Sequence, residues 1–154
     1  MPKITPFLWF DAQAEDAAKF YVSIFPNSKI TRIACRMEAA PANASNVLTV
    51  EFELDGKRYL ALNGGPQQKF TEAISLMVHC KTQHEIDRYW SALTADGGEE
   101  GVCGWLKDKY GLSWQIVPEV ISELLAGRDR AKANRVMAAV MNMKKLDLAQ
   151  LEQA

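Results

Sequence analysis

The feature that most constrains the fold is a pattern that occurs in both halves of the chain. The segments FLWFDAQAEDAAKFY and SLMVHCKTQHEIDRYW each place a strand-like run, a turn, an acidic helix start and an aromatic pair in the same order. The aromatic pairs are Phe20-Tyr21 and Tyr89-Trp90. This spacing indicates an internal duplication with a unit of about 55 to 70 residues, at the upper edge of the range in which repeats decide a fold.

The first half of the chain predicts a strand, a helix and three further strands. Apolar residues at helical spacing follow Asp11 and end before Pro26, with acidic residues in the first turn, where the helix dipole favours them. The dipeptide Asp55-Gly56 is a strong hairpin signal, and the loop over 38–46, rich in small residues, is a candidate flexible flap. Strands are expected over residues 4–10, 28–37, 47–54 and 57–62.

The second half predicts the same order of elements, followed by a helical tail. A helix over 83–93 places its apolar residues on one face, and Asp96 with two glycines ends it. Asp129 is a suitable N-cap for a last helix, whose apolar stripe must be buried. The stripe consists of Ala133, Val136, Met137, Val140, Met141 and Met143. Strands are expected over residues 73–80, 102–106 and 112–117.

Together these elements predict an α+β fold made of two βαβββ modules. Four strands and one helix cannot cover both faces of a sheet, so the two modules should combine into one sheet assembly around a common cavity. We therefore expect a single domain over residues 1–154. It would contain a first module over 1–65, a second over 72–118 and a C-terminal helical tail over 119–154.

Composition excludes several classes of partner and compartment. The net charge is −1 and the pI near 6.1, which gives no global field to attract nucleic acid or an anionic membrane. The basic stretch over 128–145 is typical of the solvated face of a helix. Three widely spaced cysteines indicate a reducing compartment. No apolar run suits a membrane span or signal peptide, so we expect a cytoplasmic protein.

Several longer segments carry a resemblance to a known family. WFDAQAEDAAKFYVSIFPNSKI, FELDGKRYLALNGGP, the strand at Ala73 to Cys80, GGEEGVCGWLKDKYGLSWQIVP and the closing MNMKKLDLAQLE resemble the PhnB-like branch of the vicinal oxygen chelate superfamily, which includes glyoxalase, bleomycin-resistance and dioxygenase proteins. Members of this branch often carry the label 3-demethylubiquinone-9 3-methyltransferase-like. The resemblance spans nearly the whole chain, and it implies the glyoxalase/bleomycin resistance fold, usually a homodimer with curved sheets around a cavity.

The resemblance also implies where a metal would be held. Metal-using relatives bind a divalent cation through His or Glu at the start of the first strand and late in the last strand of each module. Of the residues at the corresponding positions of this chain, only Gln115 could bind a metal, weakly, through its side-chain carbonyl. His79 and His84 lie on none of these positions. We therefore predict no strong metal site and no cofactor, and binding of a divalent metal is kept as the alternative. The positions fall near Thr5 or Pro6, Ala61, Ala73 or Ile74, and Gln115.

Candidate ligand contacts come from large or polar residues near the expected cavity. Tryptophans on predicted strands supply apolar walls with an N–H donor, although strand aromatics more often belong to the core. The side-chain amide of Asn63, just before Gly64-Gly65, could face the mouth of the cavity; alternatively, Asn63 is simply the last residue of a strand before a turn. A cysteine in a glycine-rich, aromatic turn could line the cavity. The candidates are Trp9, Asn63, Cys103, Trp105, Trp114 and Gln115; no residue is assigned a catalytic role.

Three functions are compatible with these observations. We favour a binding protein that holds a small apolar or aromatic molecule without a strong metal site, because this requires only an apolar pocket with a few polar groups. The alternative is a metal-dependent enzyme of the glyoxalase or dioxygenase type. A methyltransferase is disfavoured, because Gly64-Gly65 and Gly97-Gly98 lack the strand-to-helix context of a nucleotide site. The expected partners are a small-molecule ligand and a second copy of the chain.

Overall fold

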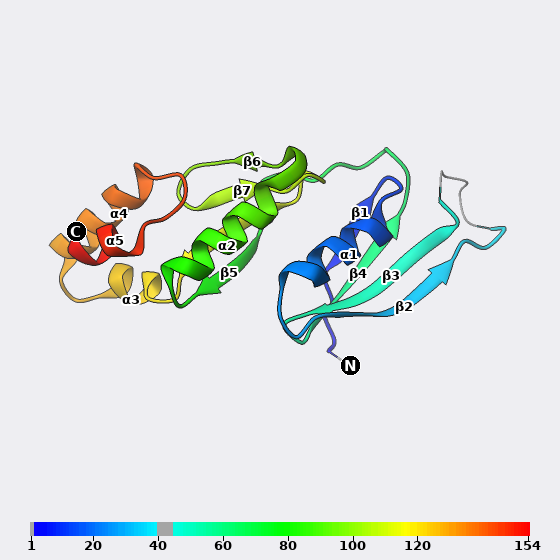
Figure 1. Ribbon diagram of the computed structural model, residues 1–154, viewed down its shortest axis with the longest axis horizontal. Helices are drawn as coiled ribbons and strands as arrows, with labels where there is room; N and C mark the ends of the chain where they lie inside the picture. The colour runs from blue at the N-terminus through cyan, green and yellow to red at the C-terminus, as the bar shows by residue number, and fades with distance from the viewer. Residues whose placement is uncertain (1, 40–44) are drawn as a thin grey trace. The chain divides into compact units, whose positions relative to one another are not determined.

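The computed structural model describes residues 2–39 and 45–154, and within them the two halves repeat one arrangement (Figure 1). The chain divides into two compact units, residues 1–70 and 71–154. Each unit contains a four-stranded sheet, with strand orders β1-β4-β3-β2 and β5-β8-β7-β6, so equivalent strands occupy equivalent places. The predicted duplication of a βαβββ unit in an α+β fold is therefore confirmed. The common cavity and the homodimer stay predictions.

The elements follow the repeat closely. The first unit consists of β1 (Phe7–Phe10), α1 (Ala14–Ile24), β2 (Lys29–Cys35), β3 (Val47–Leu54) and β4 (Lys57–Asn63). The second unit consists of β5 (Leu76–Cys80), α2 (Gln83–Thr94), the 3-10 turn η1 (Ala95–Gly97), β6 (Glu99–Glu100), β7 (Trp105–Lys107), β8 (Ser113–Pro118), α3 (Ile121–Ala126), α4 (Arg130–Met141) and α5 (Leu148–Gln153). In each sheet the strands that come first and last in the sequence, β1 with β4 and β5 with β8, pair in parallel. The remaining pairs are antiparallel.

In the first unit, α1 packs on β3 through small residues that let the two elements approach closely. Tyr21 of α1 lies 6.3 Å from the ring of Phe52, and Phe52 stacks on Tyr59 at 5.5 Å. Alternation along β3 buries Val50 and Phe52 on this side and leaves Glu51 half-buried on the other. The apolar faces predicted from the sequence are thus confirmed for this unit.

The hairpin between β3 and β4 forms at the predicted dipeptide. Asp55 and Gly56 both have left-handed backbone angles, with φ of +48° and +76°. This is the geometry of a tight two-residue turn whose twist matches that of the strands. Leu54 and Lys57 consequently face each other across the turn.

In the second unit, α2 begins at the N-cap Thr82, whose hydroxyl accepts a hydrogen bond from the Glu85 N–H at 3.2 Å. Its inner face consists of the four predicted apolar residues, Ile86, Tyr89, Trp90 and Leu93, all of them buried. On β8, Trp114 and Ile116 are buried as well, while Gln115 between them stays partly exposed.

The C-terminal tail forms three helices and belongs to the second unit. Asp129 caps α4 as predicted, accepting a hydrogen bond from the Lys132 N–H at 3.0 Å. Within the single chain, Met137 and Met141 of the predicted apolar stripe are 42% and 65% exposed, so burial of the whole stripe stays a prediction that requires a second copy of the chain. Both side chains lie outside the face of α4 that packs on the hydrophobic core of the tail. That core consists of Val117, Val136, Val140, Leu146 and Leu151.

Several boundaries differ from the prediction for local reasons. Helix α1 begins at Ala14 rather than at Asp11. The strand expected over 102–106 begins only at Trp105, because Cys103 and Gly104 take left-handed angles and form a turn. The strand β6 consists of two exposed glutamates and has no hydrophobic alternation to predict it. Within the proposed flap over 38–46, residues 40–44 lie outside the described residues. Across the described ranges, the helices are too short or too polar to cross a bilayer.

Candidate functional site

The second unit contains a pocket of about 490 Å³ beside β7. Trp105 and Lys107 of β7 and Ser113 of β8 contribute to its wall from one face of the sheet. The opposite face of β7 presents Leu106, which is 2% exposed and packs into the core near α2. Because side chains alternate along β7, Trp105 and Lys107 lie on the same face and give the pocket an aromatic ring and a cation.

A turn over residues 101–104 forms the apolar side of the pocket, to which Val102 and Cys103 contribute. Cys103 has a φ of +60° and Gly104 a φ of +82°. At Gly104 a Cβ atom would lie 3.0 Å from the carbonyl oxygen of Ile116, so glycine suits this position for space as well as for backbone angle. The strained turn therefore needs contacts from elsewhere to hold its shape.

The C-terminal tail supplies those contacts. The N–H groups of Cys103 and Gly104 donate to the carbonyl oxygens of Met143 and Lys144, each at 2.8 Å. Consecutive backbone donors of the turn are thus satisfied by consecutive carbonyls of the segment between α4 and α5. The pocket wall and the tail form one hydrogen-bonded structure.

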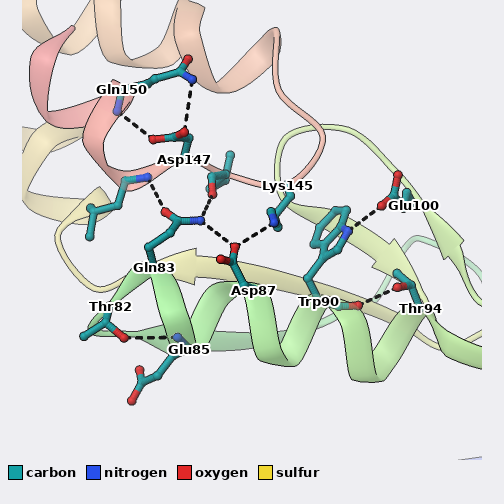
Figure 2. Close-up of polar contacts among 12 residues, drawn as sticks. Thr82, Gln83, Glu85, Asp87, Trp90, Thr94, Glu100, Lys145, Asp147 and Gln150 are labelled. Carbon is teal, nitrogen blue, oxygen red and sulfur yellow. Dashed lines mark hydrogen bonds and ion pairs between the residues drawn. The ribbon is translucent and has the colours of Figure 1, made fainter.

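Helix α2 holds the same segment through polar contacts, as Figure 2 shows. The amide of Gln83 donates to the Leu146 carbonyl at 3.1 Å and accepts from the Leu148 N–H at 2.8 Å. Lys145 forms an ion pair with Asp87 at 2.8 Å, and this hydrogen bond holds the pKa of the Asp87 carboxyl below its usual range. One helix thus positions the tail segment that shapes the turn.

The charged groups of the pocket are mostly carboxylates. Lys107 and Glu72 form an ion pair at 2.7 Å, which lowers the pKa of Glu72 and raises that of Lys107, with the Glu99 charge adding to the latter. Glu100 accepts a hydrogen bond from the indole N–H of Trp90 at 2.9 Å (Figure 2). Three carboxylates and one ammonium group therefore surround an apolar interior.

Ser113 supplies the polar group at the base of the pocket. Its residue surface is only 1% exposed, and within the described part of the chain its hydroxyl oxygen finds no hydrogen-bond partner. Its side chain projects from the same face of the sheet as Lys107, which it pairs with across the strands. Buried hydroxyl groups nearly always have a partner, so this one requires an explanation.

Two of the residues predicted to contact a ligand, Cys103 and Trp105, lie together in this pocket. Trp114 and Gln115 lie on β8 with opposite orientations. Trp114 is 2% exposed, and its indole N–H donates to the Asp108 carboxylate at 2.8 Å. Gln115 donates to the Ser75 hydroxyl at 2.9 Å. The structure therefore gives Trp114 a place in the core.

The other two candidates, Trp9 and Asn63, belong to the first unit. The indole N–H of Trp9 donates to the Gly65 carbonyl at 2.9 Å, and its ring covers Gly64, where a Cβ atom would come within 2.4 Å of it. Asn63 is 1% exposed, and its amide bridges the start of α1 to the start of β3. Both side chains have partners within their own unit.

The positions that the resemblance assigns to metal ligands do not fit a divalent cation. Ala61 is fully buried on the α1 side of its sheet, so the open face at this place carries Leu60 and Leu62, which are not ligands. Ala73 and Ile74 are exposed and precede β5. In residues 2–39 and 45–154, no three His, Cys, Asp or Glu side chains gather as a metal site would require.

Sequence reasoning did not single out Glu72, Lys107 or Ser113. Glu72 lies in a turn well before Lys107 in the sequence, and only the fold of the second unit brings the two charges together. Ser113 has no feature in the sequence that separates it from an ordinary strand residue. Its buried, unpartnered hydroxyl becomes apparent only in the folded structure.

The three cysteines provide a direct test of this environment. Burial, together with the nearby Glu85 and Glu119 charges, raises the pKa of the Cys80 thiol to about 12. The thiolate is the reactive form, so Cys80 should resist a maleimide reagent at pH 7.5 in the native protein. The exposed Cys35 should react first and the half-buried Cys103 more slowly. Mass spectrometry of digested samples over time would check this order, and rapid labelling of Cys80 would contradict it.

Comparison with known proteins places the fold and the family. The family model described as 3-demethylubiquinone-9 3-methyltransferase matches residues 2–117. The PhnB protein of Bacillus cereus, a solved structure that carries the same methyltransferase name, is 35% identical, with a TM-score of 0.69 over 76% of this chain and 99% of its own. None of the curated proteins matches the chain significantly.

More distant structures share the fold alone. A protein from Pseudomonas aeruginosa is 16% identical, with a TM-score of 0.64 over 77% of this chain and 98% of its own. The fosfomycin resistance protein FosX from Listeria monocytogenes is also 16% identical, with a TM-score of 0.51 over 77% and 93%. The family model and the PhnB structure together show that the chain belongs to the 3-demethylubiquinone-9 3-methyltransferase family.

Proposed function

We propose that this protein binds a small apolar or aromatic molecule in the pocket of its second unit. The observation that carries the proposal is the wall itself, in which Trp105, Val102 and Cys103 surround a volume of about 490 Å³ with a few charged groups at the edge. Small-molecule sites usually combine such an apolar lining with a small number of polar groups, in volumes of roughly 300 to 1,000 Å³.

Two features of the wall support binding rather than simple packing. Val102 is 59% exposed although it is apolar, and it lies beside the partly exposed ring of Trp105. A ligand that covers both would remove apolar surface from water, at roughly 25 cal/mol per Å². The hydrogen bonds from Cys103 and Gly104 to the tail hold this surface in place before a ligand arrives. Such preorganisation reduces the ordering cost of binding.

The other functions have weaker support in this chain. Among the positions that would hold a metal, only Gln115 offers a side-chain ligand, and a weak one, whereas Ala61, Ala73 and Ile74 offer none. The glycine pairs that a nucleotide-type methyl donor would need do not connect a strand to a helix: Gly97-Gly98 comes after α2 and leads into β6. We therefore take the family name as evidence of common ancestry and base the proposed function on the pocket.

A ligand-binding experiment with a neutral aromatic probe tests the proposal. Addition of 2-naphthylmethanol to the full chain should raise the melting temperature of the transition that includes the second unit. At ten times Kd the stabilisation is about 1.4 kcal/mol, or about 3–6 °C for a chain of this size. Trp105→Ala should weaken binding about tenfold, through loss of the aromatic contact.

Two further variants keep the result interpretable. Val102→Arg alters an exposed residue, so it should block the pocket without unfolding the protein. Trp9→Ala makes the same chemical change as Trp105→Ala in the first unit and should leave binding intact. Protection of Cys103 from maleimide, measured in a Cys35→Ser background, gives an independent readout of occupancy. No binding by the unaltered protein, or equal loss in the Trp9 variant, would contradict the proposed site.

A further inference from the structure

We propose that the pocket selects an organic cation, namely an amine or protonated nitrogen heterocycle carried on an apolar or aromatic body. This inference rests on the proposed function and specifies the chemical class of its ligand. Two independent observations carry it: the balance of charge around the pocket and a buried hydroxyl group without a partner.

The charge balance of the wall favours a positive ligand. Lys107, the cation of the wall, is already paired with Glu72 at 2.7 Å. Both residues of β6 are exposed glutamates: Glu99 pairs with Lys107 and shares the pocket face, whereas Glu100 pairs with Leu106 and accepts a hydrogen bond from Trp90 on the α2 side. The three carboxylates of the lining thus outnumber its one ammonium group. This excess of negative charge should repel an anionic ligand and attract an ammonium group.

The hydroxyl of Ser113 independently requires a partner from outside the chain. Its oxygen is buried and unpartnered, and its side chain extends from the pocket face of β8. A buried polar atom left unpaired destabilises the folded state, so such a group is normally satisfied by ordered water, an ion or a ligand. A hydroxyl oxygen accepts a hydrogen bond, and a ligand N–H is a donor that also suits the neighbouring carboxylates.

The apolar part of the wall is suited to the remainder of such a molecule. The ring of Trp105 lies in the wall between the acidic strand β6 and Ser113, and indole is the aromatic group that attracts cations most strongly. Val102 and Cys103 add apolar surface on the side of the turn. The pocket lining therefore combines groups that match a charged nitrogen with surface that matches an apolar body.

Three probes with the same ring system test the charge preference. The probes are 2-naphthylmethylamine, 2-naphthylmethanol and 2-naphthoate, which are cationic, neutral and anionic at pH 7. We expect calorimetry on the full chain to show the amine binding at least tenfold more tightly than the alcohol, and the carboxylate binding most weakly. A higher salt concentration should reduce the preference for the amine, because it screens exposed charges.

Substitutions identify the groups responsible. The double variant Glu99→Gln with Glu100→Gln should remove the preference for the amine and leave the affinity for the alcohol unchanged. Glutamine at position 100 can still accept from Trp90, so the fold is retained. The matched control is Glu152→Gln, an exposed change on α5, which should alter neither affinity. Ser113→Ala should weaken the amine about tenfold while the ligand-free protein keeps or gains thermal stability.

The outcomes separate this inference from the proposed function. If the alcohol binds as tightly as the amine, or the carboxylate more tightly, the cation preference is wrong and the pocket remains a binding site. If none of the three probes binds, the proposed function itself fails. If Ser113→Ala raises stability without weakening the amine, the hydroxyl takes no part in recognition, and the inference is overturned in the form stated here.

Discussion

Replacement of Asp108 by alanine should destabilise the second unit by about 3 kcal/mol, the largest loss that we expect from a single polar side chain. Asp108 is 2% exposed, and its carboxylate accepts at least three hydrogen bonds. Two come from the backbone N–H groups of Tyr110 and Leu112, at 2.8 and 3.1 Å, and one from the indole of Trp114, at 2.8 Å. Hydrogen bonds to a charged group contribute roughly 1.5 to 3 kcal/mol each, and alanine would leave a buried indole donor without its partner.

Asp108 also fixes the turn that leads from β7 into β8, the strands that carry Trp105 and Ser113. Urea denaturation, with near-UV circular dichroism to follow the tryptophans, would measure the loss. Asp108→Asn keeps an oxygen for the backbone donors but weakens the acceptance from Trp114, so it should fall between wild type and alanine. Asp16→Ala, an exposed change on α1, is the control and should cost less than about 1 kcal/mol. A loss below about 1 kcal/mol in Asp108→Ala would contradict this account.

Replacement of Asn63 by alanine should destabilise the first unit by about 2–3 kcal/mol. Its side-chain oxygen accepts from the Ala14 N–H at 2.8 Å, and its amide donates to the Val47 carbonyl at 3.0 Å. The N-cap residue of α1, Gln13, makes no side-chain capping bond. Asn63 therefore caps a helix from a strand far along the chain, and its loss leaves a buried helix donor unpaired.

A comparison of variants distinguishes this role from ligand contact. Asn142→Ala removes an exposed amide that donates to Ala138 at 2.9 Å, and it should cost less than about 1 kcal/mol in the same urea experiment. Asn63→Asp keeps the acceptor for Ala14 but loses the donor to Val47, so its free energy of unfolding should be lower than that of the wild type. If Asn63→Ala leaves stability unchanged and instead abolishes probe binding, the residue contacts ligand, as the sequence alone allowed.

Local patterns predicted the elements of the fold well, because their causes are local. The hairpin at Asp55-Gly56 follows from the backbone angles that this dipeptide tolerates. The inner face of α2 follows from helical spacing, and the cap at Asp129 follows from its side chain and its place before the helix. The repeat itself predicted the same βαβββ order of elements in both units.

The pocket could not be predicted to the same degree, because its residues meet only through the fold. Trp105 and Trp114 look equivalent in the sequence, but Trp105 pairs with Gln115 while Trp114 pairs with Leu106, so the two indoles leave opposite faces of the sheet. Alternation does not reveal this on β8, where nearly every residue is buried. The metal position that the resemblance placed at Ala61 lies on the helix side of its sheet, since Ala61 is buried in the alternating strand β4.

The link between the 101–104 turn and the tail also determines the order in which the molecule can be completed during synthesis. The contacts described for the first unit all join residues within positions 1–70, so this unit has what it needs to fold while the second half is still being translated. The turn at Cys103 and Gly104 has to wait, because the carbonyls that hold it belong to Met143 and Lys144. The pocket beside β7 therefore takes its final shape only after residues 143 and 144 have left the ribosome.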